Sequence, residues 1–257
     1  MGDSIAFHGA RGAVLAEGPQ AWLCDRESLG LDCTAVRIKA MQLTQLQHQE
    51  CLKAVACHDF VRAIPFELSN RRAHSAPQVL SAGGATALEK GNLLVALLRC
   101  SAIPARLRMY ALASDHLRGL VGGHGVVLHP VVEAYVAQRW VGSDAFHLDV
   151  PLALAGRRRL HREGQRCGWG VHLSGAPTWN GASDAFAIFD WRKPAAHPAF
   201  DWGVFHDSED FAQVAATLAG ALKPGATPVR SWFESWTVGR MRLDGNVSVR
   251  PMSPTAR

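Results

Sequence analysis

The stretch GATALEKGNLLVALLRCSAIPAR, residues 84–106, decides the fold of this 257-residue chain. Thr86 is a suitable N-cap, and the residues from Ala87 to Cys100 place apolar side chains on nearly every side of a helix. A helix that is apolar all round belongs inside a domain. After Pro104 the segment 105–110 alternates as a strand does. The pattern therefore predicts a buried helix that leads directly into a sheet.

The segments before this stretch predict further helical structure. Residues 41–61 carry apolar side chains at helical spacing, so we expect one amphipathic helix there, closed by Pro65. Residues 66–86 are small and polar and predict a flexible loop. Residues 1–40 predict irregular strands that wrap the edge of the domain.

The segments after it predict mostly β structure and loops. Residues 126–136 and 139–144 predict a hairpin, and residues 151–205, rich in Gly, Trp and Pro, predict long loops packed by aromatic side chains. A helix returns at 207–222. We therefore expect an α+β fold in which a buried helix packs on an antiparallel sheet. The length of 257 residues predicts one domain over 1–257, with a core at about 41–150 and elaborations at both ends.

The hairpin brings a histidine and a carboxylate together if its turn is short. With a two-residue turn at 137–138, Asp144 comes opposite Val131. His129 shares a face with Val131 and is then diagonal to Asp144, at roughly 7–8 Å between backbones. A three-residue loop would instead move Asp144 to the other face. The sequence Ala-Gln is not a favoured two-residue turn, so both registers stay open at this stage.

Composition excludes several classes of protein. Hydrophobic residues make up 48% and charged residues 19%, as in a folded globular protein, and no apolar stretch reaches the roughly 18 residues of a membrane span. The six cysteines form no CxxC pair, so we expect buried thiols in a reducing, cytoplasmic setting. The net charge of +5 favours anionic partners, but scattered arginines without a recognisable module argue against nucleic acid.

Residues 84–106, together with HPVVEAY at 129–135 and RWVGSD at 139–144, resemble the core of the transglutaminase-like superfamily of papain-like enzymes. The ordered combination covers about residues 54–149. The resemblance implies a papain-like core and acyl transfer or amide hydrolysis through a thioester. It implies a cysteine at the start of the buried helix, His129 as base and Asp144 as the carboxylate that orients it. It implies no cofactor.

The position of that cysteine is occupied by Ala87. Cys100 cannot replace it, because thirteen residues of helix rise roughly 20 Å. Lys90 shares the motif, but we expect it on the helix surface or in a salt bridge. The spacings of His124, His129, His147 and His161 match no familiar zinc pattern, and we expect no metal.

Two explanations of Ala87 remain. Either alanine was introduced to trap a substrate complex or to inactivate the protein, or the chain is a natural pseudoenzyme that acts as a binding protein. We favour substitution, because His129, Asp144 and the helix pattern are intact. The expected substrate is an acyl or amide compound, carried in one reading by an acidic carrier protein in bacterial biosynthesis. A peptidase or amidohydrolase is the alternative reaction.

Overall fold

The computed structural model describes residues 18–68, 73–120, 126–188 and 200–221, together with the short strands 242–243 and 247–248. The helices are η1 (Pro19–Leu23), α1 (Thr34–Thr44), α2 (Glu50–Ala63), α3 (Ala76–Ser81), α4 (Ala87–Cys100), η2 (Ser114–Leu117), α5 (Val150–Glu163) and α6 (Ser208–Ala221). The strands are β1 (Ala105–Ala113), β2 (Val126–Val136), β3 (Arg139–Ser143), β4 (Cys167–Gly168), β5 (Val171–His172), β6 (Phe200–Phe205), β7 (Arg242–Leu243) and β8 (Val247–Ser248).

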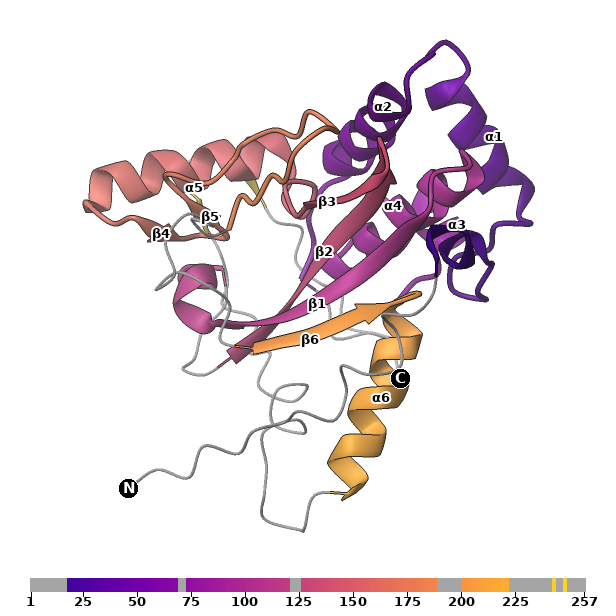
Figure 1. Ribbon diagram of the computed structural model, residues 1–257. Coiled ribbons are helices and arrows are strands. Elements are labelled where there is room, and N and C mark those ends of the chain that lie inside the picture. The colour runs from indigo at the N-terminus through magenta and orange to yellow at the C-terminus, as the bar shows by residue number, and fades with distance from the viewer. Residues whose placement is uncertain are drawn as a thin grey trace, which may run out of the picture.

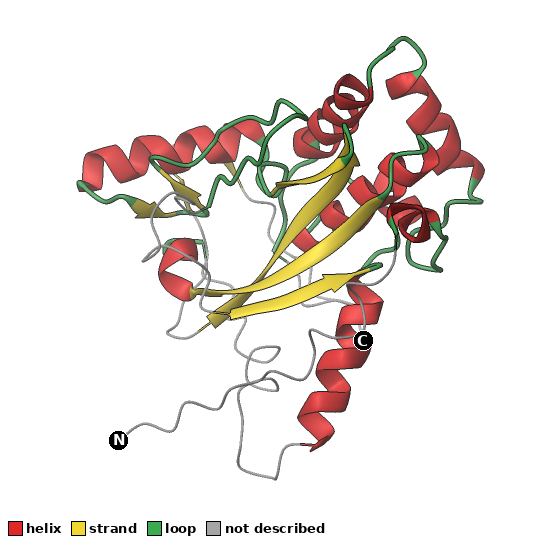
Figure 2. Cartoon of the chain, in the orientation of Figure 1, coloured by secondary structure: helices red, strands yellow, loops and turns green. Residues whose placement is uncertain are grey.

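The architecture is a four-stranded antiparallel sheet with helices packed on both of its faces. Its strand order is β3-β2-β1-β6. Helices α1 to α4 lie together beside the sheet, and α5 with the β4–β5 hairpin lies on its opposite side (Figure 1). Figure 2 shows the same arrangement with the helices in red and the strands in yellow. The predicted α+β fold is confirmed.

Helix α4 is the centre of the core, as its apolar pattern predicts. All its residues from Glu89 to Arg99 are buried. Its leucines pack with Leu107, Met109 and Val132, which alternate onto one face of the sheet. A second apolar cluster, which includes Tyr110 and Val131, forms on the opposite face and contains residues of α5 and β5. The sheet is therefore covered on both faces.

The single helix expected at 41–61 is wrong. Two helices occur instead, α1 and α2, separated at residues 45–49, and both pack against α4. Neither Gly nor Pro marks the break. A continuous helix over 34–63 would be about 45 Å long, so the chain gains more burial by folding back along α4. Packing decides this boundary.

Other expected loops contain helices. The segment 66–86 includes α3, which begins with a capping box between Ser75 and Gln78. The segment 151–205 begins inside α5, which Asp149 caps and Gly164 ends with φ +62°. Residues 18–40 form η1 and part of α1 rather than strands, and residues 1–17 lie outside the described part. The helix expected at 207–222 is confirmed as α6.

The hairpin has the shorter of the two possible turns. Val136 pairs with Arg139, and Val132 pairs with Ser143, so Asp144 follows directly after the last paired residue of β3. Ala137 and Gln138 have φ values of +50° and +62°, the conformation of a two-residue type I′ turn. The register that places Asp144 on the His129 face is thus confirmed. Among the described residues, no helix is long and apolar enough to cross a bilayer.

Candidate active site

The N-terminus of α4 is held by a complete capping box. The Thr86 hydroxyl accepts from the Glu89 backbone N–H at 3.3 Å, and a Glu89 carboxylate oxygen accepts from the Thr86 N–H at 2.8 Å. Ala85 bonds to the strand-like segment 65–67 through Pro65 O and the Glu67 N–H, both at 2.9 Å. Because both sides of the helix start are bonded, the first turn of α4 has a fixed position.

Ala87 is the first residue of α4 and is half-buried. It packs against the second apolar cluster, which includes Tyr110, the direct partner of His129 on the neighbouring strand. One turn further along α4, a Cβ atom added to Gly91 would lie 3.6 Å from the Cβ of Pro130. Pro130 directly follows His129 in β2. The helix start therefore lies against the sheet region that carries His129. Direct facing of Ala87 and the His129 ring stays a prediction.

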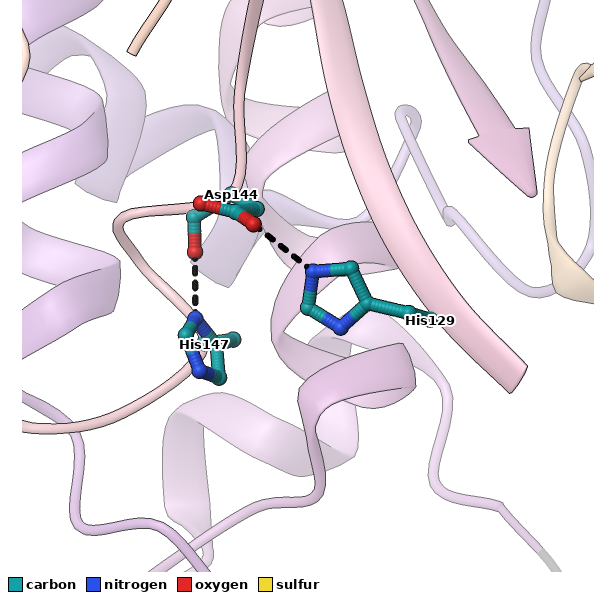
Figure 3. A group of neighbouring side chains, drawn as sticks. All are labelled: His129, Asp144 and His147. Carbon is teal, nitrogen blue, oxygen red and sulfur yellow. Dashed lines mark hydrogen bonds and ion pairs between the residues drawn. The ribbon is translucent and has the colours of Figure 1, made fainter. Parts of the chain in front are cut away.

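His129 and Asp144 form a buried pair, as the hairpin register predicts. His129 Nε2 lies 2.9 Å from Asp144 Oδ2, and the two side chains are 3% and 0% exposed. Figure 3 shows the imidazole of the strand directed at the carboxylate just beyond the neighbouring strand. An ionised carboxylate only accepts, so Nε2 carries a proton and donates it. The lone pair of a neutral His129 ring is then on Nδ1.

A segment far away in the sequence completes the surroundings of Asp144. The Ala187 N–H donates to Asp144 Oδ1 at 2.5 Å, and the Asp144 N–H donates to Ala185 O at 3.3 Å. Burial raises the pKa of Asp144, but the hydrogen bond and charge of His129, the charge of His147 and the Ala187 N–H outweigh it, so the net pKa is lowered. Asp144 is therefore held as a carboxylate inside the protein.

His147 is a neighbour of this pair whose role sequence reasoning missed. Its ring lies edge-on to His129, with 5.1 Å between ring centroids. Nδ1 lies 2.6 Å from Asp144 O, and Nε2 lies 2.8 Å from Gly170 O. A neutral imidazole has one N–H, so the ring donates to one of these two carbonyl oxygens and lies between the backbone of Asp144 and the β4–β5 turn (Figure 3 draws the first contact). The sequence signal that could have indicated this contact is the position of His147, three residues after Asp144.

His129, Asp144 and His147 are close enough to hold a metal ion, with one ligand atom from each within 4.8 Å of the others. The surroundings of His147 do not fit this use. Both of its nitrogens face backbone carbonyl oxygens, so neither directs a lone pair at a shared ion. Burial lowers the pKa of His147 to about 4, against the attraction of Asp144. The group is better described as a buried histidine–carboxylate pair that a second histidine contacts. Two further histidines were considered as metal ligands from the sequence. His161 is exposed, and His124 lies outside the described residues.

Lys90 is fully buried, which corrects the expectation of a surface or salt-bridging side chain. Its ammonium donates to Ile64 O at 2.8 Å and lies 3.4 Å from Arg62 O, at the C-terminal end of α2. Burial lowers the pKa of Lys90 to about 7, with Asp149 opposing the shift and Arg62 adding to it. Lys90 therefore ties the start of α4 to the end of α2, where helix carbonyls attract a cation.

Part of the chain resembles a known protein family. The family model of the transglutaminase-like superfamily matches residues 38–145, a segment that includes Ala87, His129 and Asp144. Similar solved structures are a candidate cysteine protease from Cytophaga hutchinsonii (19% identity, 50% of this chain and 42% of that chain, TM-score 0.40) and a candidate protease from Parabacteroides distasonis (17%, 48% and 26%, TM-score 0.33). This chain spans less than half the length of either protein. No curated protein matches it. Residues 38–145 are therefore similar in sequence to the transglutaminase-like superfamily.

Proposed function

We propose that this protein is built for acyl transfer or amide hydrolysis through a thioester, and that its catalytic form carries cysteine in place of Ala87. The buried His129–Asp144 pair is the observation that carries the proposal. An imidazole bonded to a buried carboxylate through one nitrogen keeps the other nitrogen available as a base. The N-terminus of α4, which begins at Ala87, adds backbone N–H groups and partial positive charge to the same region.

The reaction would use these groups in sequence. A thiol at position 87 loses its proton to His129 Nδ1, and its sulfur attacks the carbonyl carbon of an amide or thioester. The N–H groups at the start of α4 stabilise the oxyanion. The carbonyl re-forms, the bond to the leaving group breaks, and His129 returns the proton to that group. Water or an amine then attacks the thioester, and Asp144 stabilises the charged imidazole in both halves.

With Ala87 in place the reaction stops before its first step, because the side chain has no thiol. A chain with alanine at this position can bind a substrate but cannot form the acyl-enzyme. Substitution of an active enzyme is favoured over a natural pseudoenzyme, because burying the ionised Asp144 costs free energy that only its partners recover. The complete set of those partners, from His129 to Ala187, is what a working site requires.

The test restores the thiol. Ala87→Cys is expected to form a covalent acyl-enzyme with thioester or amide substrates, seen as a mass increase on the peptide that contains residue 87. Ala153→Cys is the matched control, because Ala153 is also half-buried near the start of a helix and packs on the same cluster. No adduct at position 87 across both substrate classes would contradict the proposed reaction. Turnover of peptides without added amine would favour the peptidase alternative.

We also propose an acidic carrier protein as the source of the acyl group. The net charge of +5 supports this choice, since an anionic partner gains from encounter with a basic chain. The affinity for an acyl-loaded carrier is expected to fall as salt rises, because exposed charges are screened within about 8–10 Å near physiological ionic strength. Titration calorimetry at low and high salt checks it, and binding that does not change with salt would contradict it.

A further inference from the structure

A second cysteine–histidine contact lies away from the candidate active site. Cys24, just after η1, places its sulfur 3.2 Å from His206 Nδ1, just after β6. The two residues are 182 positions apart in the sequence, and the contact is exposed to solvent. An imidazole at this distance can accept the proton of a thiol. The pair therefore combines a nucleophile and a base at the protein surface.

Arg99 fixes this corner of the molecule. Its guanidinium donates to Cys24 O at 2.6 Å, to His206 O at 3.0 Å and to Ala105 O at 2.8 Å. One of its nitrogens also lies 4.0 Å from the Cys24 sulfur. Arg99 is 4% exposed, so its positive charge is poorly screened by water. The same side chain thus sets the position of both partners and places a cation beside the sulfur.

Trp22 adds a second, independent feature. Its ring stacks on His206, with 4.5 Å between centroids, and is 0% exposed. The indole Nε1 of Trp22 is buried without a hydrogen-bond partner among the described residues. An unsatisfied buried donor costs free energy, so such groups are uncommon in folded proteins. An acceptor group on a bound molecule would satisfy it.

The other thiols have less favourable surroundings, and the expectation that the cysteines are mostly buried is wrong. Cys57 is the one fully buried thiol of the six, and burial raises its pKa to about 12. Cys100 and Cys167 are half-buried, and burial raises the pKa of each. Cys24 is exposed and lies between an imidazole and a guanidinium, the surroundings in which reactive thiols occur.

We propose that Cys24 is the reactive thiol of this chain and a site of mixed-disulfide formation with low-molecular-weight disulfides. The Cys24 sulfur gives its proton to His206 and attacks one sulfur of the disulfide. The S–S bond of that molecule breaks, a new S–S bond forms to Cys24, and the departing thiolate takes the proton. Cys24 is oxidised and the departing half is reduced.

The first experiment needs no variant. The unsubstituted protein is treated briefly with a limiting amount of iodoacetamide, and the modified peptides are quantified by mass spectrometry. Cys24 is expected to react at least about tenfold faster than Cys100 and Cys167, which serve as internal controls. Equal rates at the three thiols would overturn the proposal.

The second experiment separates the base from simple exposure. His206→Phe keeps an aromatic ring against Trp22 but removes the proton acceptor, and it is expected to reduce labelling of Cys24 severalfold. His161→Phe, at an exposed histidine on α5, is the matched control and should leave the rate unchanged. An unchanged rate in His206→Phe would overturn the thiol–imidazole pair.

The third experiment tests the ligand class. Incubation with oxidised glutathione is expected to add one glutathionyl group, located on the Cys24 peptide and removed by dithiothreitol. Cys24→Ser should abolish this adduct. Modification that is spread over the other cysteines, or none at all, would overturn the assignment of the site. The outcome is independent of position 87, so it leaves the proposed acyl-transfer function untouched.

Discussion

The two histidine sites in this protein differ in what surrounds the imidazole. His129 is buried on the carboxylate of Asp144, beside a helix start that carries a methyl group where a thiol is expected. His206 instead meets the exposed thiol of Cys24 on the surface. The first site holds its imidazole in one orientation at the cost of burying a charge. The second places a nucleophile within reach of any small molecule.

The comparison teaches that a base and a nucleophile have different requirements. Orientation of a catalytic imidazole needs burial and several bonds, and Asp144 receives these from three segments of the chain. Reactivity of a thiol toward small electrophiles needs exposure and nearby positive charge, which Arg99 supplies at Cys24. Changes at the two sites should therefore differ in their effect on stability.

The largest expected effect is at Asp144. Asp144→Ala removes an acceptor from His129 and from the Ala187 N–H inside the protein, so the free energy of unfolding should fall by about 3 kcal/mol. Cys24→Ser changes an exposed group and should alter it by less than about 0.5 kcal/mol. Urea denaturation of both variants measures the difference, and equal losses would remove the distinction between the sites.

A smaller effect is expected from Lys90 and depends on pH. Because its folded pKa of about 7 lies below the ordinary 10.5, the unfolded chain binds a proton that the folded chain lacks between these values. The contribution of Lys90 to stability therefore rises with pH through this window, and its full cost applies below about pH 7.

Urea denaturation at pH 7 and pH 9 should show wild-type protein gaining up to about 2 kcal/mol relative to Lys90→Met. The same substitution at half-buried Lys53 is the control, and its difference from wild type should stay constant. A constant difference for Lys90→Met as well would show that the ammonium stays charged in the folded protein.

Sequence reasoning predicted the parts of this molecule that depend on local pattern. The bounds of α4 follow from its Thr86 cap and its apolar run, and the His129–Asp144 contact follows from strand alternation and turn length. The break between α1 and α2 could not be predicted in this way, because packing on α4 causes it without a Gly or Pro signal.

Long-range contacts account for most of what was missed. The Cys24–His206 pair joins residues near opposite ends of the described chain, and only the tertiary structure brings them together. Burial of Lys90 likewise depends on where α2 ends. Helix α5 is different, since Asp149, Pro151 and Gly164 are recognisable start and stop signals that the Gly-rich composition of the wider segment obscured.

A still smaller effect tests how the start of α4 is positioned. Thr86→Ala removes the side-chain half of the capping box and should lower the free energy of unfolding by about 1 kcal/mol. Thr86→Ser keeps the hydroxyl and should restore most of it. If both variants match wild type in thermal denaturation, the capping box does not hold the helix start.

The most direct test of the central claim is the reactivity of a thiol at position 87. Ala87→Cys is made together with Cys24→Ser, so that the surface thiol does not compete for reagent. The new thiol of this double variant is expected to react with iodoacetamide at least about tenfold faster than the thiol of Ala153→Cys in the same background. Adding His129→Gln should remove the advantage, and Asp144→Asn should reduce it. If the thiol at position 87 reacts no faster than that control, or is indifferent to His129, the helix start and the histidine do not form one catalytic site.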